Sequence, residues 1–284
     1  MITIQEILAD DKQLPPSPQI LPKLLTILQG GEGTSWEIVE LARVDQALTA
    51  QVLAWSNSAF YGFSEPCDDL ETAISRIGLR ELYKLVGMII SKRLVGSKVA
   101  CYVLDEGQLW ENSIACAFCM EILATKLGEN PSECYTIGLL HAIGKTVINQ
   151  CVDKEYDNVF ALIDEKMIPL NQAEQEVLGF NHAQLSQALL EKWKFPQVIS
   201  EAVGFQYDPR GASPKCSKFA WMMHLANWIA AGIGHNPGRD SWALDVLPET
   251  FEKLSLSETL LHSILLDVHE KIDSVKSQLV SARV

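Results

Sequence analysis

The sequence has little positive charge for its length. It holds 23 Lys and Arg against 36 Asp and Glu, a formal net charge of −13 at pH 7. No cluster of basic residues offsets this excess, and an acidic surface repels the phosphate backbones of DNA and RNA. We therefore expect no nucleic acid among the direct partners of this chain.

Long apolar runs are also missing. The best candidate, Phe219 to Ile233, is shorter than the roughly 20 residues of a membrane span and includes His224 and Asn227, so we expect a buried helix and no membrane contact. The N-terminus lacks the basic start and apolar stretch of a secretory signal. Seven cysteines, an odd number at irregular spacing, favour reduced thiols in a cytoplasm.

Alternating strand patterns bounded by Asn-Gly or Asp-Gly turns are absent, which argues against a sheet. Apolar residues instead recur every three or four positions, as amphipathic helices require. Helix-start signals precede several of these runs: Asp45, Asp69 and Asn181 as single caps, and Thr34–Glu37 and Asn171–Glu174 with capping-box spacing. The sequence thus predicts an all-α fold, a compact bundle of many helices.

The breaks between these runs are short. Segments such as Pro15–Pro18 and Gly62–Asp69 are too brief to link independent domains. A chain of 284 residues can bury one large core or divide into two packed lobes. We predict one continuous globular unit, with an N-terminal helical lobe at 1–103 and a second lobe with a C-terminal helical extension at 104–284.

The segment Gly138-Leu-Leu-His141-Ala142-Ile-Gly144-Lys145 stands out for the carboxylate that it lacks. It resembles Gly-Leu-Leu-His-Asp-Ile-Gly-Lys, the motif of the HD superfamily of metal-dependent phosphohydrolases. In that superfamily the adjacent His and Asp, in the middle of a helix, both bind a divalent metal. Ala142 occupies the Asp position, and a methyl group cannot coordinate a cation. The resemblance implies a catalytic site that is kept for its shape.

The same resemblance implies two more ligand positions in this chain. The upstream His position, one residue before a Ser, holds Asn112, and the distant Asp position, at the end of a His-Leu-Ala-Asp-like run, holds Asn227. Among the four positions only His141 remains as a ligand. One imidazole and two neutral amides bind first-row metals weakly, so we expect no metal, no other cofactor and no catalysis.

Further segments resemble one branch of this superfamily, the HD-related output domain, HDOD. In chain order these are Leu14–Pro18, Val44–Thr49, Asn57–Gly62, Ala73–Gly78 and Gly179–Pro196. Two departures occur: Gln46 replaces a Pro, and Gly204–Tyr207 stands where the family often carries paired histidines. The resemblance covers about Leu14 to Asn227. It implies an HD-like helical bundle from a bacterial regulatory protein, usually without demonstrated catalysis.

A candidate ligand pocket at the vestigial metal site consists of Asn112, His141, Lys145, His182 and Asn227. Each of three members has a structural alternative that we favour. His141 would be a buried histidine hydrogen-bonded between helices. Lys145 would be a surface lysine, solvated or with a buried stem. His182 would make a structural contact at a helix start rather than bind an anion.

A candidate partner-binding loop consists of Asn57, Phe60, Tyr61 and Phe63. Clustered aromatic side chains often anchor protein partners. Asn57 at a helix end would equally satisfy free carbonyls and fix the turn of the chain, so both interpretations stay open. The pair Cys116 and Cys119 has CxxC spacing. It lies inside a helical stretch without further ligands nearby, so we interpret it as core rather than as a zinc or redox site.

Together these observations predict a non-catalytic regulatory module of bacterial signal transduction. It would lie in the cytoplasm and act through contacts with other signalling proteins, with a small molecule in the vestigial site as a candidate input. Two alternatives stay open: a residual metal-dependent phosphohydrolase acting on a nucleotide or cyclic nucleotide, and a metal-free nucleotide sensor.

Overall fold

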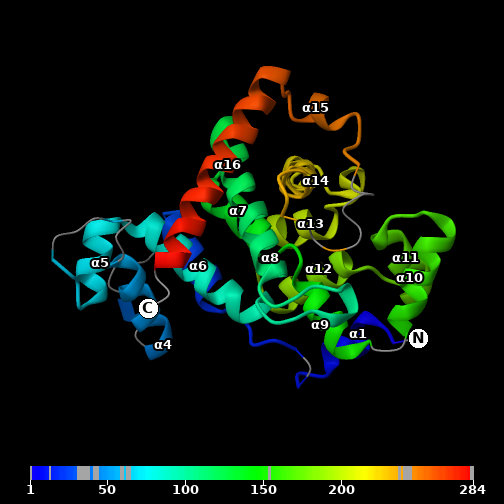
Figure 1. Cartoon of the computed structure of the whole chain (residues 1–284), viewed down its shortest axis with the longest axis horizontal. Helices are drawn as coiled ribbons and strands as arrows, with labels where there is room; N and C mark the ends of the chain where they lie inside the picture. Colours follow the sequence, from blue (N-terminus) through cyan, green and yellow to red (C-terminus); the bar gives the residue numbers. More distant parts are fainter. Residues whose placement is uncertain are drawn as a thin grey trace. The chain divides into compact units, whose positions relative to one another are not determined.

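The computed structural model describes residues 2–12, 14–30, 39–40, 45–57, 61, 65–152, 155–235, 238 and 245–281, without the side chains of 155 and 274–281. Within these ranges every regular element is a helix and no strand occurs (Figure 1). One isolated antiparallel bridge joins Val99 and Leu104. The predicted all-α class is confirmed.

Contacts within the chain define two compact units, and both are discontinuous in sequence. The first combines residues 1–17 with 91–268, and the second combines 18–90 with 269–284. The lobe boundary that we expect near residue 103 stays a prediction, because contacts alone do not show which segment folds independently.

The first unit contains most of the helices (Figure 1). They are α1 (Ile4–Ala9), the 3-10 helix η1 (Ala100–Tyr102), α7 (Gln108–Leu127), α8 (Pro131–Leu140), α9 (Ile143–Cys151), α10 (Glu155–Lys166), α11 (Leu170–Leu178), α12 (His182–Lys192), α13 (Gln197–Gly204), the 3-10 helix η2 (Pro209–Gly211), α14 (Ser217–Gly232) and α15 (Thr250–Lys253). The second unit contains α2 (Ile20–Leu28), α4 (Gln46–Ser56) and α5 (Leu70–Ile77). Two long helices contribute residues to both units: α6 (Leu79–Val95) and α16 (Glu258–Ser281).

Three of the predicted helix caps are present. The carboxylates of Asp45 and Asp69 and the amide of Asn181 each accept a hydrogen bond from a backbone N–H in the first turn of the following helix. The capping box expected at Asn171–Glu174 is wrong, because α11 begins after Pro169 and Glu174 is fully buried in its middle. The other expected box, Thr34–Glu37, lies outside the described residues.

The core of the first unit forms where α7 and α8 pack along each other. Gly138 allows the close approach, since a β-carbon there would lie 2.5 Å from the carbonyl oxygen of Cys116. Gly144 has the same role between α9 and α12, where a β-carbon would collide with the main-chain oxygen of His182 and the hydroxyl of Ser186. Both glycines of the HD-like motif therefore serve helix packing.

The apolar segment at 219–233 forms most of α14, and its side chains are largely buried, as predicted. Among the described helices none combines the length and apolarity needed to cross a membrane. Cys116 and Cys119 are fully buried inside α7, which fits their interpretation as core residues, and all seven cysteines are free.

Candidate functional site

His141 and Ala142 lie at the break between α8 and α9, whereas the HD motif leads us to expect them inside one helix. Because the chain turns there, His141 is directed into the core and is only 2% exposed. Its Nδ1 donates a hydrogen bond to the carbonyl oxygen of Gly138 at 2.7 Å, which leaves Nε2 as the unprotonated nitrogen. Ala142 begins α9 without a side-chain cap and is also buried.

The imidazole of His141 is neutral at physiological pH. Burial lowers its pKa to about 3, and the nearby Lys145 and His182 act in the same direction, against the opposing hydrogen bond to Gly138. A neutral imidazole can offer a lone pair to a metal. The site would then need further donors with negative charge to hold a divalent cation.

The two asparagines at the other ligand positions are engaged inside the protein. The Nδ2 of Asn112 donates to the carbonyl oxygen of His235 at 2.8 Å, and its Oδ1 is buried with no hydrogen-bond partner among the described residues. The Oδ1 of Asn227 accepts from the thiol of Cys116, one helical turn after Asn112, at 3.6 Å. Neither amide brings the negative charge that a divalent metal favours.

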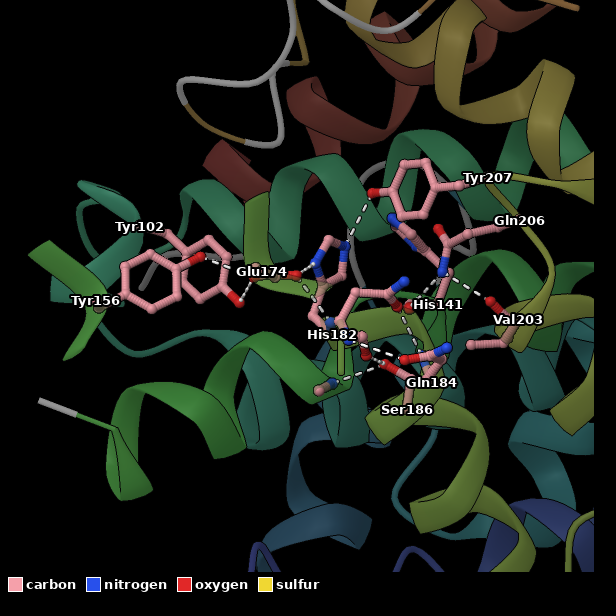
Figure 2. Close-up of polar contacts among 12 residues, drawn as sticks. Tyr102, His141, Tyr156, Glu174, His182, Gln184, Ser186, Val203, Gln206 and Tyr207 are labelled. Atoms are coloured by element: carbon pink, nitrogen blue, oxygen red, sulfur yellow. Dashed lines mark hydrogen bonds and ion pairs between the residues drawn. The ribbon is translucent and has the colours of Figure 1, made fainter. Parts of the chain in front are cut away.

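Gln206 connects the remaining members of the site. Its Oε1 accepts from Nδ2 of Asn227 at 2.8 Å. Its Nε2 donates to the carbonyl oxygens of His141 at 3.1 Å and Val203 at 2.9 Å (Figure 2). Gln206 is fully buried. It lies in the stretch where the family often has paired histidines, and both polar atoms of its amide are hydrogen-bonded within the protein.

We call Asn112, His141, Ala142, Asn227 and Gln206 the ligand-position cluster. None of its side chains carries a formal charge at neutral pH. Across the described part of the chain, no group of three or more His, Cys, Asp or Glu is arranged to hold a metal ion. One neutral imidazole with three amides, two of which have both polar atoms hydrogen-bonded, is a poor fit to the divalent metal of the HD superfamily.

A second buried group of polar residues surrounds Glu174, which has no solvent exposure. One carboxylate oxygen accepts from both the main-chain N–H of His182 at 2.9 Å and its Nδ1 at 2.7 Å. The other accepts from the phenols of Tyr102 at 2.5 Å and Tyr156 at 2.7 Å. The Nε2 of His182 lies 2.8 Å from the phenol oxygen of Tyr207. Figure 2 shows the carboxylate between the two tyrosines and His182.

We call Glu174, His182, Tyr102, Tyr156 and Tyr207 the Glu174 cluster. Burial alone would raise the pKa of the Glu174 carboxyl, but the charge and hydrogen bonds of His182, with the Tyr102 phenol, outweigh it and hold that pKa below its ordinary value. Burial and the charge of Glu174 raise the pKa of both Tyr102 and Tyr156, so both stay protonated as donors. The cluster therefore contains a buried carboxylate with all its bonds made.

Lys145 lies beside this cluster and not at the surface. It is 1% exposed, and its Nζ lies 5.0 Å from the ring centre of Tyr102, within the range of a cation–π contact. The expectation of a surface lysine is therefore wrong. The ammonium group lies over the ring of Tyr102, whose phenol donates to Glu174.

The five residues of the predicted ligand pocket are all buried. Gln206 links His141 to Asn227, and Tyr102 contacts both Lys145 and His182. None of the five lines the cavity of about 390 Å³ that the structure contains beside η1 and the first turn of α7. Their joint role in binding a ligand stays a prediction.

The predicted partner-binding loop is described only in part. Asn57 ends α4 and exchanges two hydrogen bonds with the backbone of Cys67, accepting at 2.7 Å and donating at 2.8 Å, so it closes the loop. Tyr61 is partly buried, and burial followed by the charge of Glu81 raises its pKa to about 12. Phe60 and Phe63 lie outside the described residues. The structural role of Asn57 fits this geometry, and the docking role stays a prediction.

Sequence reasoning missed Glu174 and Gln206 as members of the site. The only local signal for Gln206 was its place in the stretch Gly204–Tyr207, where paired histidines were expected. For Glu174 no local signal exists, because its partners Tyr102 and His182 come from other segments.

Comparison with solved structures gives similar helical folds over nearly the whole chain. A Shewanella amazonensis protein named "Putative phosphohydrolase" is 25% identical, with a TM-score of 0.64, over 94% of this chain and 97% of that protein. An HDOD domain protein of unknown function from Geobacter sulfurreducens is 23% identical, with a TM-score of 0.72, over 98% and 95% of the two chains. The second likeness shows the fold alone.

Comparison with curated proteins finds an uncharacterized protein of Treponema pallidum that is 26% identical over 196 residues. These cover 67% of this chain but only 37% of that relative, so the chain spans little more than a third of its length. The family model of the HDOD domain matches residues 14–209, which starts at the predicted residue and stops short of Asn227. By this match over more than half of its length, the chain belongs to the HDOD family, a branch of the HD superfamily.

Proposed function

We propose that this chain is a non-catalytic regulatory module that acts in bacterial signal transduction through contacts with other proteins. One observation carries the proposal: the ligand-position cluster contains no carboxylate, and the amide of Gln206 bonds both to the amide of Asn227 and to the carbonyl oxygen of His141. A metal would have to displace these bonds and would gain no negative charge in return.

Regulation by such a module requires two conformations with different partner surfaces. A ligand or upstream protein shifts their populations only through a difference in its affinity for the two states. A typical coupling is about 1–3 kcal/mol, or about 5–150-fold in partner affinity. We place this activity in the cytoplasm, with other signalling proteins as the partners.

The first experiment is the metal content of the purified full chain after incubation with Mn, Fe, Zn or Mg and desalting. We expect substoichiometric metal and no phosphoesterase activity, with no difference between the parent chain and His141→Ala. His262→Ala, at an exposed position on α16, is the matched histidine control. One equivalent of metal that is lost in His141→Ala and kept in His262→Ala would overturn the proposal.

A residual metal-dependent phosphohydrolase is the second candidate, favoured by the phosphohydrolase name of the Shewanella amazonensis relative at 25% identity. It would act on a nucleotide or cyclic nucleotide through His141, Asn112 and Asn227. A hydrolysis rate that requires added metal and disappears in His141→Ala would establish it. Nucleotide stabilisation without metal in a thermal-shift screen would instead indicate a sensor, since ligand at 100 times its dissociation constant stabilises by about 2.7 kcal/mol.

A further inference from the structure

A cavity lies outside both buried clusters of the first unit. It has a volume of about 390 Å³ and lies among the turn at Val103–Leu104, the first turn of α7 and the end of α14. This is within the range of small-molecule sites, about 300–1,000 Å³. None of the four metal-ligand positions lines it. Its residues were not singled out by the sequence motifs.

Among the described residues that line this cavity, Glu111 is the acidic one and none is Lys or Arg. Its carboxylate is exposed and has no hydrogen-bond or ion-pair partner in the described part of the chain. The helix α14 ends just before Gly234, which also lines the cavity, and the C-terminal end of a helix carries negative partial charge. Glu111 lies in the first turn of α7, where the helix end carries about half a positive charge. The full negative charge of the carboxylate exceeds this partial charge, so the sum of the two favours a cation.

An apolar wall stands beside this carboxylate. Val103 is 66% exposed and adopts φ 57° and ψ 37°, a left-handed conformation that β-branched residues rarely take. The turn is held by paired backbone bonds between Val99 and Leu104, and by the phenol of Tyr102 bound to Glu174. Strain of this kind persists where the surroundings fix it, and it concentrates at ligand-binding sites. In this turn the left-handed conformation places the exposed isopropyl group of Val103 at the edge of the cavity.

A second wall of the cavity is held by a buried side chain. The carbonyl oxygen of His235, three residues after the end of α14, accepts a hydrogen bond from the Nδ2 of Asn112 on α7. The walls at Val103–Leu104 and at His235 are thus each held by hydrogen bonds to the rest of the unit, as in a preformed site.

We infer that this cavity binds a small organic cation, an ammonium or guanidinium group on a short apolar stem. The carboxylate of Glu111 pairs with the cation, and Val103 with Leu104 packs against the stem. This site is independent of the proposed function, because its occupancy requires neither the ligand-position cluster nor a protein partner.

The test is titration of the full chain with n-butylguanidine and with its neutral isostere n-butylurea, followed by calorimetry or ligand-observed NMR. We expect saturable millimolar binding of butylguanidine, about fivefold tighter than butylurea, since a partly exposed ion pair contributes up to about that factor. Glu111→Gln should abolish the preference. Glu165→Gln, at an exposed position on α10, should keep it.

Equal affinity for the two compounds, a preference that survives Glu111→Gln, or the absence of saturable binding would each overturn the inference. Val103→Gly provides a second, independent check. Glycine accepts the positive φ without strain, so this variant should have a higher Tm yet bind butylguanidine several-fold more weakly. A variant that binds as tightly as the parent chain would show that the rim has no part in the site.

Discussion

The ligand-position cluster and the Glu174 cluster lie in the same unit, and all their members except the partly buried Tyr207 are buried, but only the Glu174 cluster holds a charged side chain. In the ligand-position cluster the carboxylates of the HD motif are replaced by Ala142 and Asn227, and His141 is neutral. The Glu174 cluster retains a full carboxylate that accepts four hydrogen bonds. A buried charge is tolerated when protein groups satisfy it completely, as in the Glu174 cluster, whereas the ligand-position cluster holds no charged side chain.

The largest effect should come from removing the charge that organises the Glu174 cluster. Glu174→Ala leaves His182 and the phenols of Tyr102 and Tyr156 without their acceptor, and breaking a buried pair costs about 3–5 kcal/mol. Urea unfolding measures the loss. The control Glu176→Ala removes an exposed pair with Lys166 and should cost about 0–1 kcal/mol. Similar losses for the two variants would show that the Glu174 carboxylate stabilises the fold no more than a surface ion pair does.

The pH dependence of stability should separate the two clusters. The pKa of His141 is about 3 in the folded state against an ordinary value of 6.5, so only the unfolded chain binds this proton between those values. The contribution of neutral His141 to the unfolding free energy is complete above pH 6.5 and is lost as pH falls toward 3. The unfolding free energy then falls by up to about 1.4 kcal/mol per pH unit. The fold lowers the pKa of Glu174 from 4.5, so the contribution of Glu174 to the unfolding free energy is lost at lower pH, only below 4.5.

Unfolding free energies of the parent chain and His141→Ala between pH 7 and pH 5 test this order. The variant should show a shallower slope. Some slope should remain, because burial also lowers the pKa of His224. The exposed His262→Ala should follow the parent chain. Identical slopes for the parent chain and His141→Ala would mean that His141 is not held neutral by the fold.

A smaller effect is expected at Gln206, the centre of the hydrogen bonds in the ligand-position cluster. Gln206→Ala leaves the Nδ2 of Asn227 and the carbonyl of His141 unsatisfied, which costs about 1–3 kcal/mol. Gln172→Ala, exposed on α11, is the matched control and should stay within about 0.5 kcal/mol. If Gln206→Ala also binds metal more strongly than the parent chain, the Gln206 amide blocks a usable metal site in the parent chain.

The smallest effect is expected at Asn112, whose Oδ1 has no hydrogen-bond partner in the described part of the chain. Asn112→Leu removes this unsatisfied atom along with one bond to His235, so its unfolding free energy should change by less than about 1 kcal/mol. Asn227→Leu removes two bonds and should cost more. The reverse order would show that Asn112 and not Asn227 stabilises the ligand-position cluster.

Sequence reasoning succeeded where a few neighbouring residues decide the structure. Asp69 and Asn181 cap the helices that follow them, because capping depends on residues three positions apart. It failed where the partner is distant in sequence. Glu174 has the spacing of a capping residue but bonds to Tyr102, 72 positions away. The complete burial of Lys145 likewise depends on η1 and could not be inferred from its own helix.

The packing of Gly138 and Gly144 has a consequence for what this motif indicates. Any side chain at either position would collide with backbone atoms of a neighbouring helix, so replacing either glycine would force the helices apart whatever the chemistry of the protein. Position 142, in contrast, holds Ala where the HD motif has Asp. The two glycines therefore report on how the helices pack. A statement about hydrolysis has to be read from the residues at 112, 142 and 227.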